Sequence, residues 1–286
     1  MKKIKIKIPA KLNLTLDITG ENGGYHTLDS LFVGINVYDY ITLKKRKDGK
    51  IRLSFSGVPV SVPPEKSNAY RAAETFAKKF GTGGADIFVR RKIPSGGGMG
   101  GSSADAAGVI KGLAALYGVS DEAAIKSVAN LSGSDVAFML RGGFARVKER
   151  GTDVAALPLP VKLYFLIVAG EKGVDTAQCF ARYDKKGITY PPCTESALGK
   201  LLKKDVKGYA AVAKNDLYPS ACELCRGIED GAAALGAFAP PVMTGSGSAV
   251  FAVFASARER NAAYAALRGV YGKRLIKAET ENARGR

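Results

Sequence analysis

The segment Pro94-Ser95-Gly96-Gly97-Gly98-Met99-Gly100-Gly101-Ser102-Ser103 decides the fold. It places five glycines within six positions, between an apolar stretch at 86–93 that predicts a strand and an Ala-rich stretch at 104–117 that predicts a helix. Glycines let backbone N–H groups approach a ligand closely, and the start of a helix presents unpaired N–H groups and a positive dipole end. The segment therefore predicts a phosphate-binding loop, although it lacks the Gly-Lys-Ser/Thr ending of a Walker A loop.

The regions around this loop show the periodic patterns of strands and helices. Alternating or continuous apolar residues predict strands, and apolar or small residues at helical spacing predict helices. The predicted strands cover 3–8, 12–18, 51–56, 86–93, 143–147, 162–169 and 249–255, with a strand pair over 28–43. The predicted helices cover 68–80, ending at Gly81, and 104–117, ending at Gly118, with a third capped by Ser120 and a last one from about 257.

This mixture of strands and helices in both halves predicts an α+β protein of two domains. A chain of 286 residues is long enough for two domains of ordinary size. The segment Pro158-Leu159-Pro160 lies between predicted strands of the two halves, and prolines are typical of such junctions. We therefore expect one domain over 1–157 and another over 158–286.

The composition is that of a globular protein, since 46% of the residues are hydrophobic and 24% are charged. A membrane-spanning helix needs roughly 20 consecutive apolar residues, and the longest apolar runs, 163–169 and 249–255, are far shorter. Isoleucine and lysine alternate from Ile4 to Ile8, which predicts a strand and not the apolar region of a signal peptide. We therefore expect a cytoplasmic protein with no membrane partner.

The formal net charge is +17, and basic proteins attract anions such as nucleic acid, acidic membrane surfaces or phosphorylated metabolites. The cationic residues are spread along the chain, with one short cluster at Lys44-Lys45-Arg46-Lys47. A cluster between two predicted strands is more typical of a solvated hairpin than of a nucleic-acid patch. We therefore expect no nucleic-acid partner, and the excess charge is left without an assigned function.

The chain has four cysteines, of which Cys222 and Cys225 form a C-x-x-C pair. A zinc site needs further ligands, but the sequence contains no second C-x-x-C pair and His26 is its only histidine. A redox motif would follow a predicted strand, whereas this pair lies in a helix-like segment. We therefore interpret the cysteines as structural thiols.

Three segments, in order along the chain, resemble the motifs of the GHMP kinase superfamily. The glycine segment resembles the second motif, P-x-x-x-G-L/M-G-S/G-S-S, whose helix binds ATP phosphates. Pro9-Ala10-Lys11-Leu12-Asn13-Leu14 resembles the first motif, P-A-K-x-N-L, and Thr244-Gly245-Ser246-Gly247-Ser248 resembles the third, S-G-S-G-S. The resemblance implies a two-domain fold, with a ribosomal-S5-domain-2-like N-terminal domain and a ferredoxin-like C-terminal domain.

Further segments resemble one family within this superfamily, the 4-diphosphocytidyl-2-C-methyl-D-erythritol kinases. Residues 24–32, Gly-Tyr-His-Thr-Leu-Asp-Ser-Leu-Phe, resemble its D-G-Y-H-x-L-x-S/T-L-F signature. Residues 133–138 resemble its G-A-D-V-P-F with Ala137 in place of proline, and residues 215–217 match its N-D-L. The resemblance covers about residues 9–254. It implies ATP-dependent phosphorylation of the C2 hydroxyl of this cytidine diphosphate derivative, in non-mevalonate isoprenoid biosynthesis.

The resemblance also implies catalytic residues whose roles make chemical sense. Asp135 would accept the proton of the substrate hydroxyl as a carboxylate base. Lys11 would lie beside that hydroxyl and Asp135, favouring the ionised carboxylate and the negative charge that develops on the attacking oxygen. Asn13 would bind the substrate nearby. Phosphoryl transfer depends mainly on positioning and charge neutralisation, which these residues supply.

Binding residues for both substrates follow from the same resemblance. Tyr25 would offer an aromatic face to the cytosine ring and His26 hydrogen bonds to its edge, while Phe180 would supply the opposing face, with Thr176 nearby. Mg²⁺ is expected with ATP, and Ser103 is favoured over Ser102 as the hydroxyl that meets a phosphate or the metal. The expected ATP-binding residues are Pro94, Ser95, Gly96, Gly97, Gly98, Met99, Gly100, Gly101, Ser102, Ser103 and Ala104.

Other functions stay open at this point. A GHMP kinase acting on mevalonate or homoserine would share the glycine loop but would not need aromatic faces for a pyrimidine. A basic nucleic-acid-binding protein with an S5-like domain would need neither Lys11 nor Asp135. A family member that binds nucleotide without catalysis is disfavoured because both of these residues are present. The sequence does not decide between a monomer and a homodimer.

Overall fold

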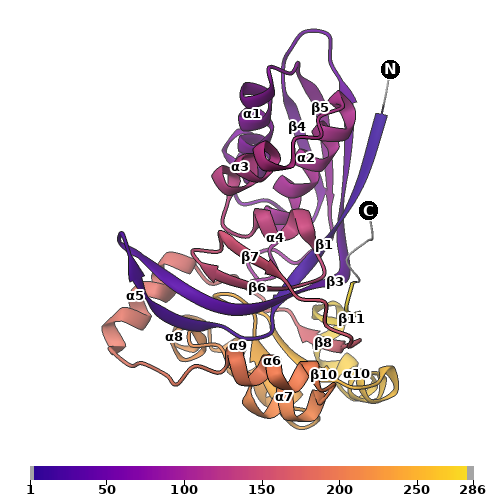
Figure 1. Cartoon of the computed structure of the whole chain (residues 1–286). Helices are drawn as coiled ribbons and strands as arrows, with labels where there is room; N and C mark the ends of the chain where they lie inside the picture. Colours follow the sequence, from indigo (N-terminus) through magenta and orange to yellow (C-terminus); the bar gives the residue numbers. More distant parts are fainter. Residues whose placement is uncertain (1–2, 282–286) are drawn as a thin grey trace. The chain divides into compact units, whose positions relative to one another are not determined.

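The computed structural model describes residues 3–281 (Figure 1). The chain divides into two compact units. Unit 1 contains the chain up to Ala10 together with Val37–Ser95 and Gly100–Gly142, and unit 2 contains Lys11–Asn36, Gly96–Met99 and the chain from Gly143 onward. The middle of the glycine loop thus belongs to unit 2 and both of its flanks to unit 1. The expected domain boundary at 157/158 stays a prediction.

Unit 1 combines strands with helices that pack on one face of them. Strand β5 pairs antiparallel with the C-terminal half of β3 and parallel with β4, and β1 also pairs with β3. Figure 1 shows α1, α2 and α3 beside these strands. The elements are β1 (Lys3–Asn13), β3 (Tyr25–Lys45), β4 (Arg52–Gly57), η1 (Pro64–Lys66), α1 (Asn68–Phe80), β5 (Ala85–Arg91), α2 (Gly101–Tyr117), α3 (Glu122–Ser132) and α4 (Val136–Arg141).

The core of unit 1 lies between this sheet and its helices. Ile41 and Leu43 on β3 and Val89 on β5 are fully buried, and the residues between them along each strand point to the opposite face. Helix α2 lies directly on the buried face, because a side-chain carbon added at Gly108 would come within 2.4 Å of Ile41 Cδ1. This close packing positions the start of α2, where the glycine loop ends.

Unit 2 contains a second sheet and most of the remaining helices. Strand β2 (Asp17–Asn22) and β6 (Phe144–Glu149) pair antiparallel with the N-terminal half of β3, and β7 (Asp153–Ala156) pairs with β6. The second sheet has the order β11-β8-β10-β9 and is antiparallel throughout. Its strands are β8 (Tyr164–Val168), β9 (Pro241–Met243), β10 (Val250–Phe254) and β11 (Leu275–Glu279).

The helices of unit 2 share a hydrophobic core with this second sheet. Leu166 on β8 and Ala252 on β10 pack with Leu217, Ala221 and Leu235 from the helical region. None of the helices in the described residues is long and apolar enough to cross a membrane. The helices are α5 (Thr176–Lys186), α6 (Thr194–Leu202), α7 (Val206–Val212), α8 (Tyr218–Leu224), α9 (Gly227–Gly236), α10 (Ala257–Tyr271) and η2 (Gly272–Arg274).

The cysteines of unit 2 are unpaired thiols. Cys179, Cys193 and Cys222 are buried and Cys225 is half-buried. Burial raises the pKa of Cys179 to about 11, and burial followed by the nearby Asp17 carboxylate raises the pKa of Cys193 to about 12. The thiols of Cys179 and Cys193 therefore stay protonated at neutral pH, which makes them poor nucleophiles.

Several sequence predictions are confirmed. The predicted α+β character is present, α1 covers the predicted 68–80 and ends at Gly81, and α2 ends at Gly118. The predicted strand pair over 28–43 is wrong, because a single 21-residue strand, β3, occupies this region. In the middle of β3, neighbouring residues such as Val33 and Gly34 are both buried, so the alternation of apolar and polar residues is interrupted there. This interruption made the region resemble two shorter strands.

Two local predictions also need correction. Asp121, not Ser120, caps α3, since its carboxylate accepts a hydrogen bond from the N–H of Ala124 at 2.9 Å. The Lys44–Lys47 cluster is not in a hairpin, because β5 lies between β3 and β4 and the two strands that flank the cluster are not neighbours. The sequence of the cluster does not indicate that β4 pairs in parallel with β5, and it therefore predicted a hairpin.

Candidate active site

The middle of the glycine loop packs tightly against the turn at 244–248 within unit 2. Gly98 has a φ of 70°, and a side-chain carbon there would lie 1.9 Å from the carbonyl oxygen of Thr244. The hydroxyl of Thr244 donates a hydrogen bond to the Gly98 carbonyl at 3.1 Å. The backbone N–H of Ser248 donates to the carbonyl of Gly96, and the backbone N–H of Ala249 donates to the carbonyl of Gly97. Glycine at 98 is therefore required by backbone conformation and by space.

The C-terminal flank of the loop is the start of α2 in unit 1. Gly100 is the N-cap residue, with no side-chain hydrogen bond to the helix, and the first turn contains no acidic residue. The first N–H groups of a helix have no intrahelical acceptor, and the helix dipole makes this end positive. Ser102 is exposed and Ser103 half-buried in this turn. The start of α2 therefore has the donors and the polarity to bind an anion.

Lys11 lies in the interior of unit 2, with only 3% of its surface exposed. Its backbone N–H donates to the carbonyl of Met99 at 3.1 Å, which attaches the first motif to the glycine loop. Its Nζ donates to Asn13 Oδ1 and lies 4.8 Å from the centre of the Phe32 ring. These contacts fix the ammonium group in one orientation.

Asn13 connects the first and third motifs. Its Oδ1 accepts a hydrogen bond from the N–H of Gly245 at 2.9 Å, and its own N–H donates to Thr244 Oγ1 at 3.0 Å. Its Nδ2 donates to Ser30 Oγ at 3.1 Å. Together with the contacts of Lys11 and Gly98, these bonds bring segments 11–14, 96–99 and 244–248 of unit 2 together around one buried side chain.

Asp135 lies in unit 1, at the N-cap position of α4. Its backbone is in the helical region and its carbonyl accepts from the N–H of Met139 at 3.0 Å, but its side chain does not cap the helix. Asp135 is half-buried, and its carboxylate does not take the usual capping role. Lys11 and Asp135 belong to different units, and their predicted proximity stays a prediction.

A buried charged cluster in unit 1 holds the two flanks of the glycine loop. Asp39 on β3 accepts hydrogen bonds from the N–H groups of Lys92 and Ile93, at 2.9 Å for Ile93, directly before the loop. Asp105, in α2 directly after the loop, lies 3.1 Å from Arg91 Nε. Burial, followed by repulsion from Asp39, raises the pKa of Asp105 to about 8.

This cluster requires a proton. Asp39 Oδ2 and Asp105 Oδ1 are buried without a hydrogen-bond donor among the described residues. Burial raises the pKa of Asp39 as well, but the two N–H donors and Arg91 oppose this effect and favour its ionised form. Asp105 therefore carries the proton at neutral pH and Asp39 the negative charge. One proton shared between the two carboxyl groups satisfies both buried oxygens.

Aromatic residues predicted to bind cytosine form two pairs in unit 2. His26 stacks on Phe180, with 4.7 Å between ring centres and 23° between ring planes, and its Nε2 lies 2.7 Å from Asp184 Oδ1. Tyr25 is 55% exposed, and its ring faces the guanidinium of Arg150 at 3.5 Å. Phe180 thus contacts His26, and Tyr25 contacts a cation that the sequence had not indicated.

Thr176, at the start of α5, is linked to the third motif. Its hydroxyl lies 2.9 Å from the hydroxyl of Ser246. Because Phe180 is on the same helix, this contact connects the aromatic pair to the turn that also packs on the glycine loop. The sequence predicted Thr176 and Phe180 as neighbours but gave no role to Ser246.

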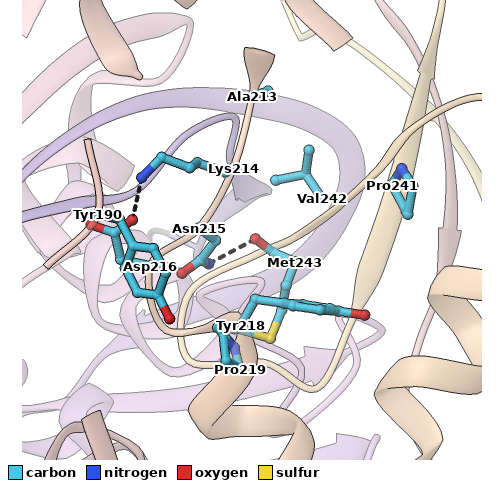
Figure 2. Close-up of a pocket in the computed structure, with 10 residues that line it drawn as sticks. All are labelled: Tyr190, Ala213, Lys214, Asn215, Asp216, Tyr218, Pro219, Pro241, Val242 and Met243. Atoms are coloured by element: carbon cyan, nitrogen blue, oxygen red, sulfur yellow. Dashed lines mark hydrogen bonds and ion pairs between the residues drawn. The ribbon is translucent and has the colours of Figure 1, made fainter. Parts of the chain in front are cut away.

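A pocket of about 300 Å³ lies beside the N-D-L segment of unit 2 (Figure 2). Asn215 Nδ2 donates to the carbonyls of Met243 and Gly245, both at 2.8 Å, so that it fixes the backbone on either side of Thr244. Lys214 forms an ion pair with Asp216 in the pocket wall. Asn215 is therefore a positioning residue for the third motif, a role that the sequence match did not reveal.

The sequence of this chain is similar to those of known kinases. The sequence model for the GHMP kinases N terminal domain matches residues 67–143. A 4-diphosphocytidyl-2-C-methyl-D-erythritol kinase from Moorella thermoacetica is 34% identical, over 95% of this chain and 98% of its own length. One from a Polaromonas species is 37% identical, over 87% of this chain and 82% of its own.

Solved structures show the same similarity at the level of the fold. A crystal structure of 4-(cytidine 5'-diphospho)-2C-methyl-D-erythritol kinase has a TM-score of 0.79 and 27% identity, covering 98% of this chain and 100% of its own. A homoserine kinase from Cytophaga hutchinsonii has a TM-score of 0.76 at 22% identity, covering 99% of this chain and 96% of its own, and shows a shared fold alone. The predicted GHMP kinase fold is confirmed.

Proposed function

Because this chain belongs to the 4-diphosphocytidyl-2-C-methyl-D-erythritol kinase family, we propose that it phosphorylates the C2 hydroxyl of 4-diphosphocytidyl-2-C-methyl-D-erythritol. The chain is an ATP-dependent small-molecule kinase of the GHMP type. The proposed reaction belongs to non-mevalonate isoprenoid biosynthesis, and we expect it to take place in the cytoplasm.

The convergence of three motifs around Asn13 carries this proposal. Segments 11–14, 96–99 and 244–248 are far apart in the sequence, yet the hydrogen bonds of Lys11, Asn13 and Thr244 join them within unit 2. Burying a network of polar side chains costs free energy, so such a network is typical of a functional site whose residues must be held in place. This network holds Lys11 in one orientation.

In the proposed mechanism, Asp135 accepts the proton of the C2 hydroxyl while the hydroxyl oxygen attacks the γ-phosphorus of ATP. The bond between the γ-phosphorus and the β,γ-bridging oxygen breaks, and ADP leaves with the electron pair. The ammonium group of Lys11 stabilises the negative charge that develops on the attacking oxygen. Positioning and charge neutralisation account for most of the acceleration in this type of reaction.

We propose that the phosphates of ATP bind along residues 94–104. The uncapped start of α2 supports this assignment, because its N–H groups and dipole favour an anion. The residues present fit an accompanying Mg²⁺ ion, which is usually held by substrate phosphates, water and one or two protein oxygens. The hydroxyl of Ser103 in the first turn of α2 would be the protein ligand, and the metal would neutralise phosphate charge.

The cytidine end of the substrate is proposed to bind at Tyr25, His26, Phe180 and Thr176. The stacked His26–Phe180 pair supports an aromatic site for a pyrimidine ring. The contact between His26 Nε2 and Asp184 fixes the orientation of the imidazole, so that it can present its edge to the base. The guanidinium of Arg150 beside Tyr25 adds a cation suited to a diphosphate.

The test is ATP consumption by the purified protein with Mg²⁺ and one acceptor at a time. 4-Diphosphocytidyl-2-C-methyl-D-erythritol, mevalonate and homoserine are compared, and Asp135→Asn is compared with Asp153→Asn, which removes the same charge from an exposed position. We expect turnover with the cytidyl substrate alone, lowered by about 100-fold or more in Asp135→Asn and unchanged in Asp153→Asn. Turnover of mevalonate or homoserine instead would refute the cytidine assignment.

A further inference from the structure

The face of the unit 1 sheet opposite α1 and α2 is both basic and aromatic. Every second residue of its strands points to this face. The residues between them point to the opposite face, where Ile41 and Val89 are fully buried. Tyr40 and Phe88 on this face are 37% and 43% exposed. We call this surface the basic sheet face, and its outward cationic and aromatic residues are Lys3, Lys5, Lys7, Tyr38, Tyr40, Lys44, Arg52, Phe88, Arg90 and Lys92.

The strand register interleaves aromatic and cationic side chains on this face. Tyr40 lies opposite Arg90, and Phe88 lies two pairs further along, opposite Thr42, so that Tyr40 and Phe88 are diagonal neighbours. Cations also lie over the aromatic rings, since Lys7 Nζ is 3.5 Å from the ring centre of Tyr38 and Lys92 Nζ is 5.2 Å from that of Tyr40. The face therefore offers stacking surfaces with positive charge around them.

The charge of this face is strongly one-sided. Seven of the outward residues named above are lysine or arginine. The outward acidic residue on these described strands, Asp86, lies opposite Lys44 and Arg52 in the strand register. It pairs with Arg46, which also pairs with Asp48, so Asp86 lowers the positive charge at this end of the face. The sequence spreads these cations over four strands, which is why they did not form a recognisable cluster along the chain. These seven are among the 43 lysines and arginines that give the chain its net charge of +17.

We propose that the basic sheet face binds single-stranded nucleic acid. This proposal replaces the expectation of no nucleic-acid partner, which rested on the order of the cations along the sequence alone. Exposed bases stack on aromatic side chains and phosphates pair with the surrounding lysines and arginines, which is how proteins hold single strands without reading a sequence. A membrane surface is less suited, since the exposed apolar groups of this face are two rings in a sheet and not an insertable helix face. The face uses none of the residues assigned to ATP or the cytidyl substrate.

Binding is tested by fluorescence anisotropy of fluorescein-labelled oligo(U) and oligo(dT) against the full-length protein at increasing sodium chloride. We expect binding at low salt, with log K falling linearly against log salt by about 0.7 per neutralised phosphate. The variant Tyr40→Ser/Phe88→Ser should weaken binding by about 10-fold or more through lost stacking. Stronger binding of oligo(U) would identify RNA, and equal or stronger binding of oligo(dT) a site that does not depend on the 2′-hydroxyl.

A charge variant and a matched control separate this face from the general charge of the protein. Lys5→Gln/Lys7→Gln/Arg90→Gln should lower the salt slope by about 2 and weaken binding. The control Lys78→Gln/Lys79→Gln/Lys126→Gln removes three exposed cations from α1 and α3 of the same unit and should leave binding nearly unchanged. Circular dichroism and kinase activity, unchanged in both triple variants, show that the variants fold.

Three results would overturn the proposal. The first is no binding of either oligonucleotide at low salt. The second is an equal loss of binding in the charge variant and its control, which would show an effect of total charge alone. The third is binding of phosphatidylglycerol vesicles, weakened by the charge variant, without binding of oligonucleotides, which would assign the face to a membrane surface.

Discussion

Replacement of Asp105 by asparagine should make the stability of the protein less sensitive to alkaline pH. Asp105 is buried between Asp39 and Arg91, and its pKa is raised from 3.8 to about 8. At neutral pH the folded protein keeps this proton, whereas the unfolded chain has lost it. Asparagine has the shape of the neutral acid and keeps a donor for Asp39, but it does not titrate.

The magnitude follows from the difference in proton binding. Between the two pKa values of Asp105 the folded state binds one proton more than the unfolded state, so the free energy of unfolding falls as pH rises. The contribution is complete below the unfolded pKa and is lost as pH rises through the folded pKa. At about 1.4 kcal/mol per pH unit, levelling off near the folded pKa, wild type should lose roughly 2 kcal/mol between about pH 6 and pH 8.

The assay is urea-induced unfolding followed by circular dichroism, at several pH values, for wild type and Asp105→Asn. The difference in the free energy of unfolding between the two proteins should grow by roughly 2 kcal/mol over that range, in favour of the variant. Asp105→Ala serves as a control, since it leaves the guanidinium of Arg91 without this partner and should destabilise the protein at every pH. Parallel pH profiles for wild type and Asp105→Asn would refute the shared-proton interpretation.

Three more substitutions test the site. Asn13→Ala removes the acceptor for Gly245 and should lower the free energy of unfolding by about 2 kcal/mol, as measured by urea unfolding; no change would show that Asn13 does not connect the motifs. Gly98→Ala should lower stability by about 2 kcal/mol or more and weaken ATP binding, measured by calorimetry, and tighter binding would contradict the assigned loop geometry. Asp184→Asn should raise KM for the cytidyl substrate several-fold with kcat nearly unchanged, and the opposite pattern in initial rates would exclude a role in orienting His26.

The fold was predictable where the chain follows local rules. Helix α1 begins after Ser67, whose hydroxyl accepts from Tyr70, and ends at Gly81 in the left-handed conformation, as the sequence indicates. Helix α2 begins at Gly101, three residues before its predicted start, because glycine and serine have low helix propensity and masked the first turn. The burial of Asp39 could not be predicted, since its partners come from β5 and α2.

In the candidate site, too, the sequence predicted the features that depend on local motifs and not those that depend on distant contacts. The local motifs indicated Lys11, Asn13 and the glycine loop directly. The contact of Asn13 with Thr244 joins residues 231 positions apart, and no local pattern predicts such a pair. The N-D-L motif indicated Asn215. Its hydrogen bonds to the backbone on either side of Thr244 depend on the folded position of the 244–248 turn, which the sequence does not give.

The way the chain alternates between the two units has a consequence for its synthesis. Segment 11–36 belongs to unit 2, yet the residues it contacts there, including those at 194, 215, 244 and 280, are translated much later. A ribosome therefore releases the first strands of unit 2 long before their partners exist. Unit 1 has all of its segments once residue 142 has emerged, so we expect it to fold first, while the early strands of unit 2 wait for the rest of the chain.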